Sequence, residues 1–278
     1  MNTDLIVSSS EIAPDYPVLE IDHPTCSARV ALHGAQVMSW HPKGQEEVIY
    51  LSPEAVFREG KAIRGGVPLC WPWFNAHPIN SELPSHGFAR SQFWDLESEE
   101  VDESGVTLKL SLRCPVWTAV VTIQMGQSLS VSFETFSFGK EPLTISGAIH
   151  TYLRVGNVGE IAIHGLEDTD YLDTVGDRVG RRQEGPVVID REVDRIYDSS
   201  SSVRLEDPVM KRTIIVEKEG SPSTVVWNPW KEKAAALGDL PDNDYRDFVC
   251  VEAAIANDRA VSLEIGDSHC FSTRISIE

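Results

Sequence analysis

The sequence has few positive charges and no long hydrophobic run. Its 278 residues carry 24 lysines and arginines against 43 aspartates and glutamates, which gives a formal net charge of −19. No stretch of lysines and arginines reaches five residues, so the basic surface that nucleic-acid binding needs is missing. No run of about 18 apolar residues occurs either, which argues against a membrane span. We therefore expect neither nucleic-acid nor membrane partners.

Cysteines are few, and their spacing fits neither a disulfide framework nor a zinc site. The five are odd in number, scattered, and without a CxxC pair: Cys26, Cys70, Cys114, Cys250 and Cys270. Their apolar neighbours predict buried free thiols. Residues 1–17, MNTDLIVSSSEIAPDYP, lack a basic region followed by an apolar run, so no secretory signal is indicated. Together these features favour a cytoplasmic location.

Helical periodicity is scarce, and the dominant period is two. Apolar residues alternate with polar ones over 106–112, 117–125 and 271–277, and turn signals recur between such runs. Only 230–238 has good helix formers, with Asn228 and Pro229 to start the helix and Gly238 to end it. This pattern predicts an all-β fold, a large antiparallel sandwich with few short helices, as a single domain over residues 1–278.

One strand shows a phase slip. Leu129, Val131 and Phe133 alternate regularly, and then Phe136 and Phe138 follow one step out of phase. A β-bulge at Glu134–Thr135 would produce this slip, and a strand break would read the same way.

Several common catalytic motifs are absent. We find no GxGxxG fingerprint, no GxxxxGK[ST] loop, no GxSxG elbow and no HExxH or other paired-histidine spacing. The expectation is a mechanism that uses no metal and no cofactor.

What the sequence does have is a concentration of polar and aromatic residues in two neighbouring segments. Residues 61–74 read KAIRGGVPLCWPWF and residues 83–90 read LPSHGFAR. They place Arg64, His86 and Arg90 among aromatics, prolines and glycines. Charges there are costly unless something pairs with them, so the segments indicate a pocket for an anionic or heavily hydroxylated ligand. Pairing of the arginines with acidic side chains is the alternative.

Two later strands carry candidate acid–base residues. In 143–155, LTISGAIHTYLRV, alternation puts His150 and Tyr152 on a polar face, which is either the floor of a cleft or a solvated outer face. In 247–255, DFVCVEAAI, Glu252 lies between apolar neighbours, where a carboxylate has a raised pKa or a specific partner. A buried hydrogen-bond acceptor without catalytic function is the alternative for Glu252.

Taken together, six segments resemble hexose-6-phosphate mutarotases, also called glucose-6-phosphate 1-epimerases, a branch of the aldose 1-epimerase superfamily. In chain order they are RGGVPLCWPWF, LPSHGFAR, AIHTYLRV, EVDRIY, WNPW and VCVEAA, from about residue 64 to 254. The resemblance implies a β-supersandwich that interconverts the anomers of a phosphorylated aldohexose without metal or nucleotide. It also implies a partner, the phosphorylated hexose, and we expect a monomer.

The resemblance assigns roles residue by residue. His150 looks like the general acid, Glu252 like the general base and His86 like a second histidine at the anomeric centre. The implied substrate ligands are Arg64, Arg90, Asp194 and Ser85. Two readings of other kinds stay open: an epimerase of free aldoses, which the paired arginines disfavour, and a non-catalytic sugar-binding protein, which the His150/Glu252 pair disfavours.

Three positions depart from the pattern of the family. Asn75-Ala76-His77 stands where many relatives have glycine, Ala253 where many have proline, and Ser85 where some have glutamine. These departures leave the fold prediction intact and bear on the shape of the pocket.

Overall fold

The computed structural model describes residues 6–278 and is built almost wholly from antiparallel strands. The all-β prediction is confirmed. Residues 1–5, the start of the segment in which we found no secretory signal, lie outside the described residues. None of the helices in the described part of the chain has the length and apolar character needed to cross a bilayer.

One layer of the molecule is an eight-stranded sheet, here called the β8 sheet. In spatial order its strands are β13 (Ala162–His164), β17 (Val203–Asp207), β18 (Arg212–Glu219), β22 (Ser268–Ile277), β9 (Leu129–Ser137), β8 (Trp117–Gly126), β7 (Gly105–Cys114) and β6 (Asp95–Asp102). The long strands β7, β8 and β9 are those that the alternating pattern predicts. Over most of their length the apolar side chains face the core and the polar ones face outward, with exceptions near the end of β9 described below.

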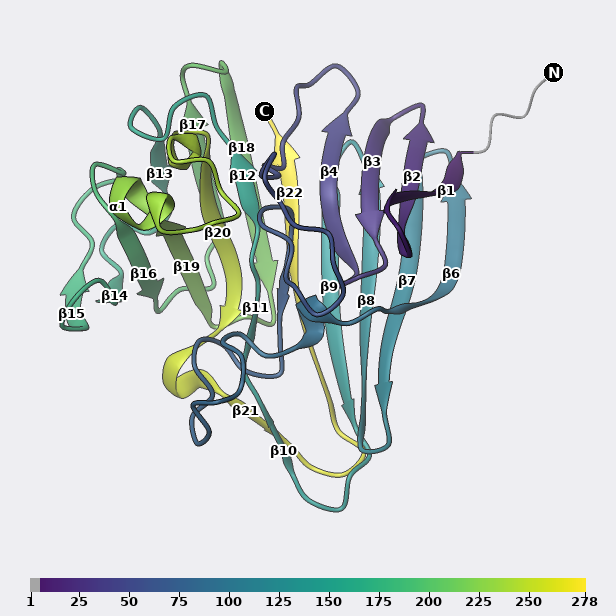
Figure 1. Ribbon diagram of the computed structural model, residues 1–278. Coiled ribbons are helices and arrows are strands. Elements are labelled where there is room, and N and C mark those ends of the chain that lie inside the picture. Colours follow the sequence, from purple (N-terminus) through teal and green to yellow (C-terminus); the bar gives the residue numbers. More distant parts are fainter. Residues whose placement is uncertain (1–5) are drawn as a thin grey trace.

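The other layer has two sheets that lie side by side in front of the β8 sheet (Figure 1). The N-terminal sheet contains β1 (Val7–Ala13), β2 (Tyr16–His23), β3 (Cys26–Ala31) and β4 (Gln36–Pro42). The β20 sheet has the order β15 (Val179–Arg182), β14 (Asp170–Asp173), β16 (Val193–Tyr197), β19 (Ser223–Asn228), β20 (Phe248–Ile255), β11 (Gly147–Ile149) and β5 (Leu69–Cys70), and β12 (Tyr152–Arg154) also pairs with β20.

The remaining elements are short. Strands β10 (Leu143–Ile145) and β21 (Val261–Leu263) form a two-stranded sheet, and the helices are α1 (Trp230–Ala235) and the 3-10 turns η1 (Ala89–Ser91), η2 (Asp244–Arg246) and η3 (Asn257–Arg259). Helix α1 begins as predicted, because the side-chain oxygen of Asn228 accepts a hydrogen bond from the Trp230 amide (2.9 Å). It ends before Gly238.

The two layers enclose a continuous apolar core. Strands β2 and β3 pack against β7 and β8, and β20 packs against β18 and β22. Strand β20 is buried on both faces, since the β8 sheet covers one face and the other lines the pocket described below. Glu252 is buried in this strand and lines that pocket, so its carboxylate is largely removed from bulk water.

The predicted β-bulge at Glu134–Thr135 is wrong. Strand β9 pairs with β8 and with β22 without any shift of register through these residues. Thr135 and Ser137 take core-facing positions, whereas the rings of Phe136 and Phe138 stack on each other on the outer face (6.5 Å between centroids, 4° between planes). The apolar residues change face here while the backbone continues regularly.

Two further expectations need correction. Residues 143–155 form three short strands, β10, β11 and β12, instead of one long one. The cysteines are all free, and three are buried as predicted, but Cys114 is half-buried and Cys270 is exposed.

Candidate active site

The β20 sheet places His150 directly against Glu252. Ile149 pairs with Ala253 and Tyr152 pairs with Cys250, so the register puts His150 opposite Glu252. His150 lies between β11 and β12, where its amide donates to the carbonyl of Pro68 (2.9 Å). The imidazole Nε2 is 3.3 Å from Glu252 Oε1, and both side chains are buried. Of the polar face predicted for 143–155, His150 and Tyr152 line a pocket, whereas Thr144 and Arg154 are exposed.

Burial opposes charge on both members of this pair. It raises the pKa of Glu252 well above its ordinary value, with a further contribution from Asp194, and it lowers the pKa of His150 well below its ordinary value. Glu252 Oε2 and His150 Nδ1 have no hydrogen-bond partner within residues 6–278. Buried polar atoms are rarely left unpaired, and these two belong to residues that line a pocket, where a polar ligand could supply the missing partner.

His86 is held by a reciprocal pair of hydrogen bonds with Asn75. The His86 amide donates to the Asn75 carbonyl (2.8 Å), and the Asn75 amide donates to His86 Nδ1 (3.2 Å). Because Nδ1 is an acceptor, the proton of the neutral ring is on Nε2. Burial, followed by the charges of Arg90 and Arg64, lowers the pKa of His86 to about 3. His86 is thus a neutral hydrogen-bond donor.

Arg64 is fixed at two points. Its Nε donates to Asp239 Oδ1 (3.0 Å), and its Nη1 donates to the hydroxyl of Tyr152 (3.2 Å). Lys61 Nζ is 3.5 Å from the second oxygen of Asp239. The sequence-based alternative, pairing with an acidic side chain, is therefore true of Arg64, although the arginine still lines the pocket.

Arg90 has no such partner. Residues 6–278 offer it no carboxylate within ion-pair distance, and its Nη2 donates to the carbonyl of Ser85 (3.0 Å). Asp194 on β16 is half-buried, and burial raises the pKa of its carboxyl. Ser85 is exposed at the rim.

One pocket of about 460 Å³ joins all seven residues that the resemblance assigns to substrate or catalysis. These are Arg64, Ser85, His86, Arg90, His150, Asp194 and Glu252. Its volume suits a monosaccharide phosphate. Four cations, Lys61, Arg64, Arg90 and Lys233, line it together with the carboxylates of Asp194, Asp239 and Glu252. Lys61 and Arg64 pair with Asp239 and Lys233 pairs with Glu192, so Arg90 is the lining cation left without a carboxylate partner in residues 6–278.

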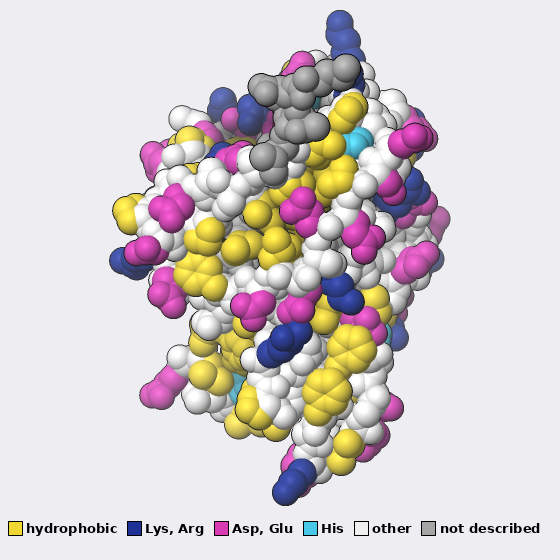
Figure 2. Space-filling view, turned by 90° about the vertical axis from the view of Figure 1, so that its right-hand side faces the viewer, with side chains coloured by type: hydrophobic (Ala, Val, Ile, Leu, Met, Phe, Trp, Pro, Cys, Tyr) yellow, Lys and Arg dark blue, Asp and Glu magenta, His cyan; other side chains and the backbone are white. Residues whose placement is uncertain are grey.

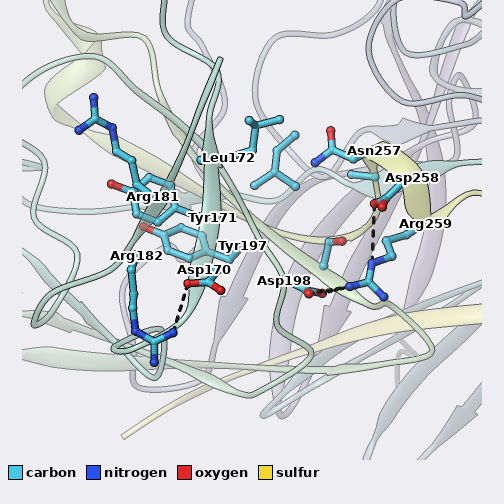
Figure 3. Close-up of a pocket in the computed structure, with 14 residues that line it drawn as sticks. Asp170, Tyr171, Leu172, Arg181, Arg182, Tyr197, Asp198, Asn257, Asp258 and Arg259 are labelled. Atoms are coloured by element: carbon cyan, nitrogen blue, oxygen red, sulfur yellow. Dashed lines mark hydrogen bonds and ion pairs between the residues drawn. The ribbon is translucent and has the colours of Figure 1, made fainter. Parts of the chain in front are cut away.

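A larger pocket of about 630 Å³ lies elsewhere, between β14, β15, β16 and η3 (Figure 3). Its charged groups neutralise one another: Arg182 pairs with Asp170 (3.2 Å) and Arg259 with Asp198 (2.5 Å). These side chains are about half exposed or more, so water already satisfies them. The smaller pocket, with its unpaired buried atoms, is the better candidate for chemistry.

Sequence reasoning missed several lining residues. Lys61 is part of the KAIR segment and could have been found from that cluster. Asp239 gave no signal, because it lies in a loop 175 residues after the arginine that it binds. Trp227 from the WNPW segment lines the pocket and packs edge-on against His150 (5.7 Å between centroids).

The structure also explains two of the departures from the family pattern. Asn75 has a positive φ of 62°, a conformation that favours glycine and that asparagine tolerates better than most residues. Ala253 belongs to the core between the layers and does not line the pocket. Neither change removes a polar group from the pocket.

No group of three or more His, Cys, Asp or Glu side chains in the described part of the chain is arranged to hold a metal ion. The polar groups that line the pocket include one imidazole–carboxylate pair, a second imidazole, two guanidiniums, two lysines and the carboxylates of Asp194 and Asp239. Such a set can donate and accept protons and bind an anion.

Comparison with known proteins identifies the family. Residues 17–276 match the family described as aldose 1-epimerase. A protein of Escherichia coli K12 named "putative glucose-6-phosphate 1-epimerase" is 35% identical over 252 residues, which are 87% of this chain and 84% of that protein. A plant protein of the same name, from Cenchrus ciliaris, is 34% identical over 263 residues, 87% of this chain and 78% of that protein.

Solved structures show the same fold. The crystal structure of a "putative mutarotase" from Salmonella typhimurium superposes with a TM-score of 0.91 at 30% identity, covering 98% of this chain and 93% of that one. A galactose 1-epimerase from Lactobacillus acidophilus has a TM-score of 0.71 at 15% identity, with 98% of each chain covered, and supports the fold alone.

Proposed function

Because the chain belongs to the aldose 1-epimerase family, we propose that it is a mutarotase of hexose 6-phosphates, most of all glucose 6-phosphate. The observation that carries this proposal is the buried contact of His150 with Glu252 (3.3 Å) in the pocket that also contains Arg64 and Arg90. A neutral sugar needs no cations, whereas a phosphate dianion is bound well by guanidinium groups.

The proposed reaction opens the sugar ring by two proton transfers, one to Glu252 and one from His150. Glu252 takes the proton from the C1 hydroxyl, C1 becomes a carbonyl, and the bond from C1 to the ring oxygen breaks. The ring oxygen keeps the electron pair and takes a proton from His150. After rotation about C1–C2 the same steps run backward and close the ring as the other anomer. Glycosidases use two carboxylates, so an imidazole–carboxylate couple suits ring opening better.

The other residues would orient the sugar. His86, neutral with its proton on Nε2, donates a hydrogen bond at the anomeric centre. Asp194 accepts from sugar hydroxyls, and Ser85 at the rim adds a polar contact. Arg90, which has no carboxylate partner within residues 6–278, and Arg64 bind the phosphate.

The test is exchange NMR between the α and β anomers of glucose 6-phosphate, galactose 6-phosphate and free glucose. We expect the protein to accelerate the exchange of the phosphorylated sugars well above that of glucose. A Glu252→Gln variant should lose about 10²-fold or more in kcat, because the base can no longer take the proton.

The alternative outcomes are distinct. Acceleration of free glucose alone would identify an epimerase of unphosphorylated aldoses. Binding without any acceleration would identify a carbohydrate-binding protein on the same fold. Ordinary turnover by Glu252→Gln would overturn the assigned base.

A further inference from the structure

Tyr152 touches both halves of the proposed site. Its ring stacks on the imidazole of His150, with 4.9 Å between centroids and 14° between planes. Its hydroxyl accepts a hydrogen bond from Arg64 Nη1 (3.2 Å). The side chain is buried and lines the pocket. Tyr152 is therefore in contact with the acid on one side and with a phosphate-binding group on the other.

The far side of Arg64 is anchored as well. Asp239 accepts from its Nε (3.0 Å), and the backbone carbonyl of Asp239 accepts from the hydroxyl of Ser52 (2.7 Å). The guanidinium is thus held between Asp239 and Tyr152. A guanidinium has five N–H groups, and these two bonds use two of them. The other N–H groups are left for a phosphate.

The hydroxyl of Tyr152 is neutral, because burial raises the pKa of this phenol. Its hydrogen-bond partner within residues 6–278 is Arg64, so the hydroxyl serves to hold the guanidinium.

The charges of the arginines at the phosphate end of the pocket act on His150 at the other end. The groups that face it are His86, Arg90, Arg64 and Glu252. After burial and His86, the positive charges of Arg90 and Arg64 lower the pKa of His150. A phosphate dianion on the arginines would offset those charges and make it easier for His150 to carry the proton that the ring oxygen needs.

We propose that Tyr152 is a positioning residue that couples the phosphate end of the pocket to the acid, so that phosphate bound at Arg64 raises the turnover of the sugar and not only its affinity. This inference rests on the proposed function. In this proposal Tyr152 and Asp239 hold Arg64 in a fixed position. Phosphate bound to Arg64 then offsets its positive charge and makes it easier for His150 to carry a proton.

The experiment supplies the substrate in two pieces. D-Xylose is glucose without its C6 group, and phosphite dianion replaces the missing phosphate. Anomer exchange of xylose is measured with and without saturating phosphite, and the enzyme-free rate in the same buffer is subtracted. For the wild-type protein we expect phosphite to raise the enzymatic rate about tenfold, as expected when a few charge-assisted hydrogen bonds act on the transition state.

The decisive variant is Tyr152→Phe, which keeps the ring that stacks on His150 and removes only the hydroxyl. We expect the phosphite activation ratio to fall below about twofold and kcat on glucose 6-phosphate to fall about tenfold, because Arg64 loses one of its two anchors. Asp239→Asn removes the negative charge that holds Arg64 Nε, and it should also lower the phosphite activation ratio. Circular dichroism and thermal unfolding check that each variant is folded.

Tyr197→Phe is the matched control. Tyr197 is also a buried tyrosine whose hydroxyl bonds an arginine, Arg195 (3.5 Å), in the same sheet, but it does not line the pocket of His150. Its activation ratio should equal that of the wild type.

Two results would overturn the coupling. One is a wild-type protein that accelerates glucose 6-phosphate but shows no phosphite activation of xylose. The other is a folded Tyr152→Phe variant whose activation ratio equals that of Tyr197→Phe. A wild-type protein without any action on glucose 6-phosphate would instead overturn the proposed function itself.

Discussion

At the scale of single residues, the site depends on the burial of an acid–base pair. Glu252 and His150 share one contact at 3.3 Å, and each keeps a second polar atom unpaired within residues 6–278. Two groups in such contact titrate as a pair. The raised pKa of Glu252 and the lowered pKa of His150 mean that this pair holds a single proton over a wide range of pH. The proposed ring opening needs that proton on His150 with Glu252 ionised, whereas both shifts favour the neutral pair, so the proton must cross the 3.3 Å contact from Glu252 to His150 before the ring opens.

This pairing predicts a broad bell-shaped pH profile of kcat/KM. The pair gains a second proton only well below pH 6.5, because the pKa of His150 is lowered from that value. It loses its only proton well above pH 4.5, because the pKa of Glu252 is raised from that value. Free glucose should be the substrate, since the phosphate group itself titrates near pH 6. An acid limb centred above pH 6.5 would contradict the lowered pKa of His150.

At the scale of elements, the segment from Trp71 to Arg90 is shaped by backbone conformations that few residues accept. Asn75, His86 and Gly87 all have positive φ. At Gly87 an added Cβ would lie 2.0 Å from the carbonyl oxygen of Trp71, which accepts the Phe88 amide. Glycine is thus required there by the close approach of the backbone as well as by its φ of 69°. This approach places His86 in the pocket.

We therefore predict that Gly87→Ala is destabilising and inactivating. The left-handed φ and the contact together should cost about 2 kcal/mol or more of the free energy of unfolding. Urea unfolding measures that cost, and anomer exchange measures the loss of activity. Gly180→Ala on β15 is the control, because a Cβ there meets nothing within 4 Å. Equal stability of the two variants would show that the segment adapts to a side chain at position 87.

At the scale of the whole molecule, acidic side chains protect an open sheet edge. Strand β6, at the right-hand edge in Figure 1, ends the β8 sheet, and all eight of its residues, DLESEEVD, are exposed. Figure 2 shows this side of the molecule, where acidic side chains are scattered among hydrophobic ones. An edge strand invites pairing with a second copy, and like charges oppose such pairing.

The monomer expected from the sequence stays a prediction, and β6 gives a way to test it. We expect the wild-type protein to sediment as a single species of 30.8 kDa. Replacing Asp95, Glu99 and Glu100 by threonine should promote self-association, because the edge then loses its repulsion. Analytical ultracentrifugation over a range of concentrations measures both. A wild-type dimer would contradict the expectation, and a variant that stays monomeric would show that the charges on β6 are not what prevents association.

The sequence by itself determined the all-β class and named seven of the residues that line the pocket. Alternation of apolar and polar residues is imposed locally by the pleat, so strands such as β7 and β8 were predictable. All seven assigned residues, among them His86 and Asp194, line one pocket. Their roles in catalysis and binding stay predictions until they are measured.

Only the tertiary structure decided how these residues meet. The contact between His150 and Glu252 follows from strand register, and the bond from Arg64 to Asp239 joins positions 175 residues apart. Neither is encoded in local pattern. The prediction of a bulge at Glu134–Thr135 was wrong for a related reason. The sequence pattern shows which side chains are apolar, but packing decides that Thr135 faces the core and that the ring of Phe136 stacks on the outer face. Contacts between distant segments set those choices, and the sequence pattern does not contain them.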